Sequence, residues 1–111
     1  MSSDVAKLNF IVEKIDDIFA FKSRYETTKE LLDDKMGFDA TLMCLLQIGE
    51  NLNSLKNEYD ILDKEDIKGT YNVRNFIAHD YEGVNKSIVE NIIIKHLPNL
   101  KARIEVILNE L

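Results

Sequence analysis

Apolar residues recur along most of this chain every three or four positions, which is the spacing of an amphipathic helix. The first stripe comprises Val5, Leu8, Ile11, Val12, Ile15, Ile18 and Phe19. It predicts a long helix that starts after an N-cap at Asp4 and ends around Arg24 or Tyr25. A short helical turn is expected at Thr27-Thr28, before a second long helix from about Gly37 to Lys56.

Three further helices are expected in the second half of the chain. The acidic cluster at 63–66 suits the start of a helix, because the helix N-terminus is the positive end of its dipole. Ser87 is a candidate N-cap for the next helix, and Pro98 suits the first turn of the last one. The apolar stripe of that last helix comprises Leu100, Ile104, Ile107, Leu108 and Leu111.

These patterns predict an all-α fold, namely an antiparallel up-and-down bundle of four main helices with one or two short ones. A chain of 111 residues suits a single domain, 1–111, with one hydrophobic core. Four glycines and one proline leave little material for the turns of a β-sandwich.

Charge and cysteine usage narrow the classes of function. A net charge of −6 argues against a broad basic face that coats nucleic acid, but it allows a small site for one or two phosphates. The single Cys44 lies among apolar residues and is expected to be a buried, inert thiol. One cysteine permits no internal disulfide, and no apolar run is long enough to cross a membrane. We therefore expect a cytoplasmic protein without a membrane partner.

The segment 74–81 carries the strongest chemical signal in the chain. It holds Arg74, Asn75, His79 and Tyr81, and thus one of three arginines and one of two histidines. A guanidinium is a permanent cation whose donors fit phosphate oxygens, and an imidazole exchanges protons near neutrality. This combination is typical of a site that acts on a phosphodiester.

Five positions separate Arg74 from His79, so on an ideal helix they point about 140° apart. Two arrangements would bring them together. The helix can end near Ala78 and let His79 swing back, or the site can form between two copies of the chain. A purely structural alternative has His79 capping the carbonyls at a helix end, with Arg74 in a surface salt bridge.

Other candidate residues carry weaker signals. Gly49 interrupts the second long helix, which suggests that another helix passes close by. Glu50 is expected at the surface or beside a cation, although it could also face the site. His96 has no arginine at the same spacing and is expected to be structural. The chain supports no zinc site, no cysteine protease and no phosphate loop, so we expect neither metal nor cofactor.

At the segment 74–81 the sequence resembles the HEPN superfamily, and specifically its HepT-like branch. Arg74 and His79 fit the R-x(4–6)-H signature, and Tyr81 completes the R-x-x-x-x-H-x-Y form of that branch. Ile48-Gly49-Glu50 matches an "IGE" stretch of these proteins, and Leu97-Pro98 matches the step that opens their last helix.

The resemblance implies a dimeric, metal-independent endoribonuclease with two motifs facing each other across the interface. Such proteins are toxins whose antitoxin is a minimal nucleotidyltransferase, which in some pairs silences the toxin by adding AMP to a tyrosine. Arg74 and His79 would then be catalytic, Asn75 supporting, and Tyr81 the modified residue. Two alternatives remain: a non-catalytic, nucleotide-binding subunit of a nucleotidyltransferase, and a purely structural helical dimer.

Overall fold

The computed structural model describes residues 3–111, except for the side chains of Ser3 and Asp66. Every regular element in this range is helical. The elements are α1 (Ser3–Lys22), α2 (Thr28–Asp33), α3 (Lys35–Asn53), α4 (Lys64–His79), α5 (Lys86–Asn91), a π-helical segment (Ile92–His96) and α6 (Leu97–Glu110). The prediction of an all-α fold is confirmed.

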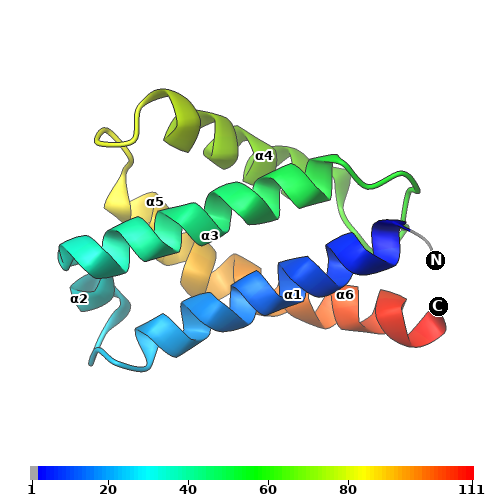
Figure 1. Cartoon of the computed structure of the whole chain (residues 1–111), viewed down its shortest axis with the longest axis horizontal. Coiled ribbons are helices and arrows are strands. Elements are labelled where there is room, and N and C mark those ends of the chain that lie inside the picture. Colours follow the sequence, from blue (N-terminus) through cyan, green and yellow to red (C-terminus); the bar gives the residue numbers. More distant parts are fainter. Residues whose placement is uncertain (1–2) are drawn as a thin grey trace.

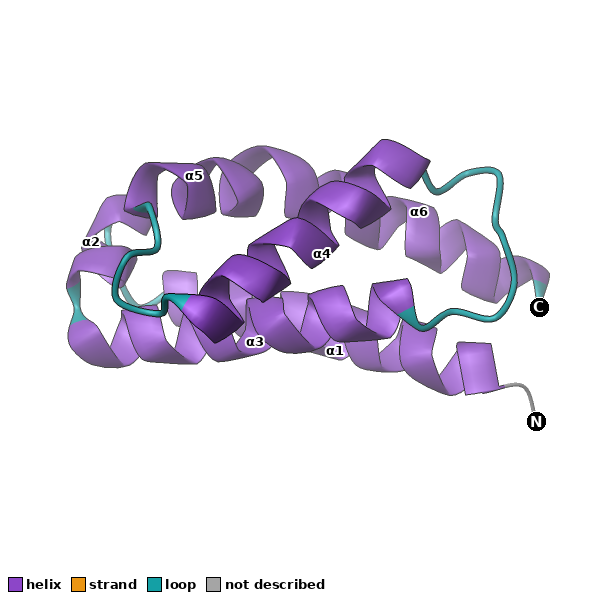
Figure 2. Ribbon diagram, turned by 90° about the horizontal axis from the view of Figure 1, so that it is seen from above, coloured by secondary structure: helices purple, strands orange, loops and turns teal. Residues whose placement is uncertain are grey.

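Successive long helices run in opposite directions (Figure 1). Helix α3 lies antiparallel to α1, α4 returns along α3, and α5 and α6 lead back to the end at which the chain begins. Seen from above, α4 lies obliquely across α3 (Figure 2). Because α4 packs chiefly on α3, much of its outer surface stays open.

The hydrophobic core lies between α1, α3 and the α5–α6 segment. Helix α1 contributes Leu8, Ile11, Ile15 and Ile18, all fully buried, while Val12 and Phe19 are partly buried. From α3 come Leu42, Leu45, Ile48 and Leu52, and from α5, the π segment and α6 come Val89, Ile93, Leu97, Leu100, Ile104 and Ile107. Most of the apolar stripes expected from the sequence therefore face the core, but Leu111, expected in the last stripe, lies beyond α6 and is exposed. Cys44 is buried as expected.

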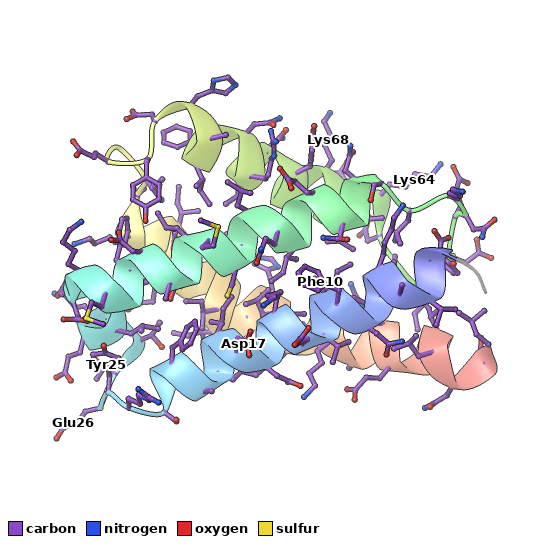
Figure 3. The ribbon with its side chains drawn as sticks, in the orientation of Figure 1. Phe10, Asp17, Tyr25, Glu26, Lys64 and Lys68 are labelled. Carbon is purple, nitrogen blue, oxygen red and sulfur yellow. The ribbon has the colours of Figure 1, made fainter. Side chains whose placement is uncertain are left out.

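The turn between α1 and α3 is held by side-chain capping. Thr27 is the N-cap of α2, and its hydroxyl accepts a hydrogen bond from the Glu30 amide at 3.1 Å. Asp34 is the N-cap of α3 and also accepts the hydroxyl of Tyr25 at 2.9 Å. Tyr25 lies at this end of the bundle (Figure 3). The carboxylate of Asp34 thus joins the loop after α1 to the first turn of α3.

The N-cap expected at Asp4 was wrong. Asp4 lies inside α1 and is fully buried, and its carboxylate accepts hydrogen bonds from the α3–α4 loop. The donors include the amides of Lys56 and Asn57, at 2.9 and 3.0 Å, the side-chain amide of Asn57, at 3.1 Å, and the hydroxyl of Tyr59, at 2.8 Å. These bonds, led by that from Lys56, lower the pKa of Asp4 from 3.8 to about 2.

One expectation about the last helices needs correction. Asn85, not Ser87, caps α5, and its side chain accepts from the amides of Ser87 and Ile88. Pro98 lies in the first turn of α6, as expected, although the backbone stays helical from Lys86 to Glu110 with no break before it. The π-helical turn before Leu97 widens the helix where the proline ring would meet a carbonyl of the preceding turn.

Among residues 3–111, no helix is both long enough and apolar enough to cross a membrane.

Candidate functional site

Gly49 determines how closely α4 can approach α3. A Cβ atom at this position would lie 2.7 Å from the Cβ of Arg74 and 3.0 Å from the carbonyl oxygen of Thr70. The first distance is shorter than real Cβ contacts and the second is tighter than most of them, so a larger residue would push the helices apart and glycine permits this close crossing. The expected close passage of another helix is confirmed, and the passing helix is α4, which carries the motif.

The same crossing places Arg74 against Glu50, the residue after Gly49. Arg74 donates from Nη2 and Nε to Oε1 of Glu50, at 2.7 and 3.1 Å. Its Nη1 donates to Oδ1 of Asn75 at 3.0 Å, and its guanidinium lies 5.7 Å from the ring centroid of Tyr71. The hydrogen bond to Glu50 raises the pKa of Arg74 above its usual value. Arg74 is therefore a permanent cation, held by two polar neighbours.

His79 is the last residue of α4, and its side chain is exposed. The helix remains regular up to this point, so His79 does not swing back toward Arg74. In the described part of the chain, no hydrogen bond or ion pair joins the two side chains, and none links His79 to a helix carbonyl. The turn is closed instead by Asp80, whose amide donates to the Phe76 carbonyl at 2.8 Å. The purely structural alternative required His79 to cap helix carbonyls and Arg74 to form a salt bridge. Only the salt bridge of Arg74, with Glu50, is observed.

Tyr81 lies just beyond the end of α4, against the first half of α3. Its hydroxyl donates to Oδ1 of Asp39 at 2.7 Å, and its ring packs edge-on against Phe38 at 5.9 Å between centroids. Desolvation and the bond to Asp39 raise the pKa of Tyr81 to about 12. The same bond lowers the pKa of Asp39. The proton therefore stays on the phenol, and 37% of the residue remains exposed.

Comparison with known proteins places this chain in a family. The model of the family described as "Ribonuclease HepT-like" matches residues 11–107. The chain belongs to the HepT-like ribonuclease family. A protein of Methanocaldococcus jannaschii named "Putative RNase MJ0127" is 30% identical over 102 residues, which cover 91% of this chain and 84% of that protein. No solved structure matches the chain significantly.

Membership of the HepT-like family bears out the resemblance seen at residues 74–81. The structure brings Arg74 and Asn75 together and leaves His79 apart from them. Sequence reasoning missed Asp39 as the partner of Tyr81, because the two lie 42 positions apart and no pattern links them. Glu50 was expected at the surface or beside a cation, and it lies partly exposed beside Arg74.

Two exposed apolar side chains lie beside the HepT-like motif. Phe76, on α4, is 51% exposed, and Ile88, on α5, is 55% exposed. Both line a hollow of about 230 Å³ between these helices. Single exposed apolar side chains are common on protein surfaces, but these two gather around one hollow, as the residues of a contact surface do. His96 is exposed, lies in the π-helical segment and lines a pocket together with Gly69, Thr70 and Val73 of α4, on the N-terminal side of the motif.

Proposed function

We propose that this chain is an endoribonuclease that cleaves RNA without a metal ion and acts as the toxin of a toxin–antitoxin pair. Its antitoxin would be a minimal nucleotidyltransferase. The observation that carries the proposal is that a partly exposed Arg74 and an exposed His79 lie on the last turns of α4, in a chain of the HepT-like ribonuclease family. The relative named as an RNase supports the same substrate class.

The chemistry follows from the two side chains. His79 takes the proton from a ribose 2′-hydroxyl, whose oxygen then attacks the adjacent phosphorus. The bond from phosphorus to the 5′-oxygen breaks, and a protonated imidazole supplies the proton that the leaving oxygen needs. The products are a 2′,3′-cyclic phosphate and a 5′-hydroxyl. Arg74 stabilises the additional negative charge of the transition state, and Asn75 supports Arg74 through its side-chain carbonyl.

A homodimer completes the site in this proposal. Within one chain Arg74 and His79 point about 140° apart on a regular helix, so a single copy presents them to different directions. A second copy related by a two-fold axis would add its own Arg74 and His79 to a shared cleft. The exposed Phe76 and Ile88 beside the motif supply an apolar surface for that contact.

Cleavage of a fluorescent RNA in the presence of EDTA tests the activity. We expect wild-type protein to cleave, and Arg74→Ala and His79→Ala to lose at least about a hundredfold in rate, as is usual for a lost general acid–base or charge-stabilising group. Circular dichroism and thermal unfolding verify that both variants are folded. Variants that cleave at the wild-type rate would sink the proposal.

Silencing would act on Tyr81. The phenol oxygen attacks the α-phosphorus of ATP, pyrophosphate leaves, and the phenol proton is lost. The added AMP would remove the hydrogen bond to Asp39 and place a phosphodiester anion two residues from His79, where it repels RNA phosphate.

Mass spectrometry after incubation with the cognate nucleotidyltransferase and ATP checks this silencing. We expect wild-type protein to gain AMP and lose cleavage activity. Tyr81→Phe is the matched control, because it keeps the ring against Phe38 and lacks only the hydroxyl; it should remain active and unmodified. Modification of the Phe variant, or none in the wild type, would rule out Tyr81 as the target.

A further inference from the structure

Glu50 makes the closest polar contact of the motif arginine. Its Oε1 accepts from two nitrogens of Arg74, at 2.7 and 3.1 Å, across the point where Gly49 lets α3 and α4 meet. The side chain of Arg74 is 27% exposed and that of Glu50 is 45% exposed. The contact therefore lies at the edge of the site, within reach of a ligand.

The hydrogen bonds leave a defined part of the guanidinium available. A guanidinium has five N–H groups, one on Nε and two on each terminal nitrogen. Glu50 takes the Nε hydrogen and one from Nη2, and Asn75 takes one from Nη1. Within residues 3–111 this leaves one N–H on each terminal nitrogen. Two such donors can bind two oxygens of one phosphate as a fork.

We propose that Glu50 is a positioning residue for Arg74 in the RNA cleavage proposed above, on which this inference rests. An arginine side chain is long and loses much rotational freedom when it is fixed. Glu50 and Asn75 hold the guanidinium by hydrogen bonds before RNA binds. The entropic cost of fixing the Arg74 side chain is therefore not added to the free energy of the transition state. Gly49 contributes to this positioning, because only a close crossing of α3 and α4 brings the carboxylate of Glu50 to Nε of Arg74.

A competing role for the same contact makes opposite predictions. A carboxylate beside the cation also weakens its attraction for RNA, and if that effect dominated, Glu50 would inhibit the enzyme. Removal of the carboxylate would then increase binding and rate. Positioning instead predicts a slower chemical step with little change in substrate affinity, and it predicts that an uncharged acceptor oxygen suffices.

Steady-state cleavage of a fluorescent single-stranded RNA by Glu50→Ala and Glu50→Gln separates these roles. We expect Glu50→Ala to lower kcat about tenfold to a hundredfold with KM nearly unchanged, since small misplacements of a reacting group have effects of this size. Glu50→Gln keeps an acceptor oxygen and should retain most of kcat. The matched control is Asp16→Ala, which removes a carboxylate from another ion pair, with Lys101, of the same 2.7 Å length and 50% exposure. It should leave both constants unchanged.

A second readout does not depend on cleavage. The chain has three arginines, so its ¹⁵N spectrum contains three Nε–H signals, and Arg74→Lys identifies the one from Arg74. We expect slow solvent exchange of this signal in wild type and Glu50→Gln, and fast exchange in Glu50→Ala.

The outcomes are distinguishable. A wild-type protein that does not cleave contradicts the proposed function, and the Nε–H signal still decides whether Glu50 orders Arg74. If wild type cleaves, then Glu50→Ala at or above the wild-type rate overturns the positioning role. A Glu50→Gln protein as slow as Glu50→Ala overturns it as well, and so does an Nε–H signal that exchanges equally slowly without the carboxylate.

Discussion

At the scale of single residues, three carboxylates each meet a donor from a distant part of the chain. Asp4 binds the loop after α3, Asp39 binds Tyr81, and Glu50 binds Arg74. Helical periodicity predicts only which residues are polar. It does not say which polar side chains meet, because that depends on how helices cross. The motif residues could be found from spacing, and a cation beside Glu50 was expected, but the partners of Asp4 and Tyr81 could not be predicted.

Asp4 should make stability depend on pH below about 4. Folding lowers its pKa from 3.8 to about 2, so its contribution is complete above pH 3.8 and is lost as the pH falls toward 2. Asp4→Asn should reduce the free energy of unfolding at pH 7 by about 1–3 kcal/mol, because loop donors lose their charged acceptor. Urea unfolding of both proteins between pH 7 and 2.5 measures this.

The difference in free energy of unfolding between wild type and Asp4→Asn should become smaller as the pH is lowered. Asp16→Asn, which affects a half-exposed ion pair, serves as control and should change little. A gap that stays constant down to pH 2.5 would contradict the role assigned to the Asp4 carboxylate.

At the scale of elements, the crossing of α3 and α4 builds the site. Gly49 on α3 receives Arg74 of α4, and Glu50 beside it supplies the acceptor. The first half of α4 carries Lys64 and Lys68, which are exposed (Figure 3). Helix α4 was predictable because its N-terminus is acidic and its spacing helical. Its oblique position on α3 was not predictable, since it depends on side-chain contacts between two helices.

Gly49→Ala should separate the two helices. Its Cβ would overlap the Cβ of Arg74, and such overpacking costs about 1–3 kcal/mol, more than the helix propensity that alanine adds. We expect a lower melting temperature and a loss of RNA cleavage, as Arg74 moves away from Glu50.

Gly69→Ala is the matched control, because a Cβ at Gly69 of α4 would meet no atom within 4 Å. It should stabilise the protein by about 0.5–1 kcal/mol and leave cleavage unchanged. Equal effects of the two substitutions on stability and activity would show that the crossing at Gly49 does not matter.

At the scale of the whole molecule, the proposed site requires two copies of the chain. One copy presents Arg74 against α3 and His79 at the exposed end of α4, with no bond between them in the part that the structure describes. The sequence predicts that one helix cannot direct both side chains to the same place, because residues five positions apart point about 140° from each other. The helix continues through His79, which removes the arrangement in which His79 swings back within one chain.

Mixing two inactive variants tests whether the site is shared. If Arg74 of one copy acts with His79 of the other, a heterodimer of Arg74→Ala and His79→Ala chains contains one intact pair. Random pairing should then restore about a quarter of wild-type activity, since half of the dimers would each carry one working site. Sedimentation equilibrium verifies the dimer. A mixture as inactive as its components would contradict this sharing.

Local patterns in the sequence determined the helices, the face of each that enters the core, and the residues of the motif. These follow from helical periodicity and residue chemistry, which act over a few positions. The tertiary structure decided that Asp4 anchors a loop, that Gly49 receives Arg74, and that Glu50 and Asp39 bind the motif side chains. It also joined the last two expected helices through a π-helical turn before Pro98. Contacts between residues dozens of positions apart depend on how the helices pack, which no local pattern encodes.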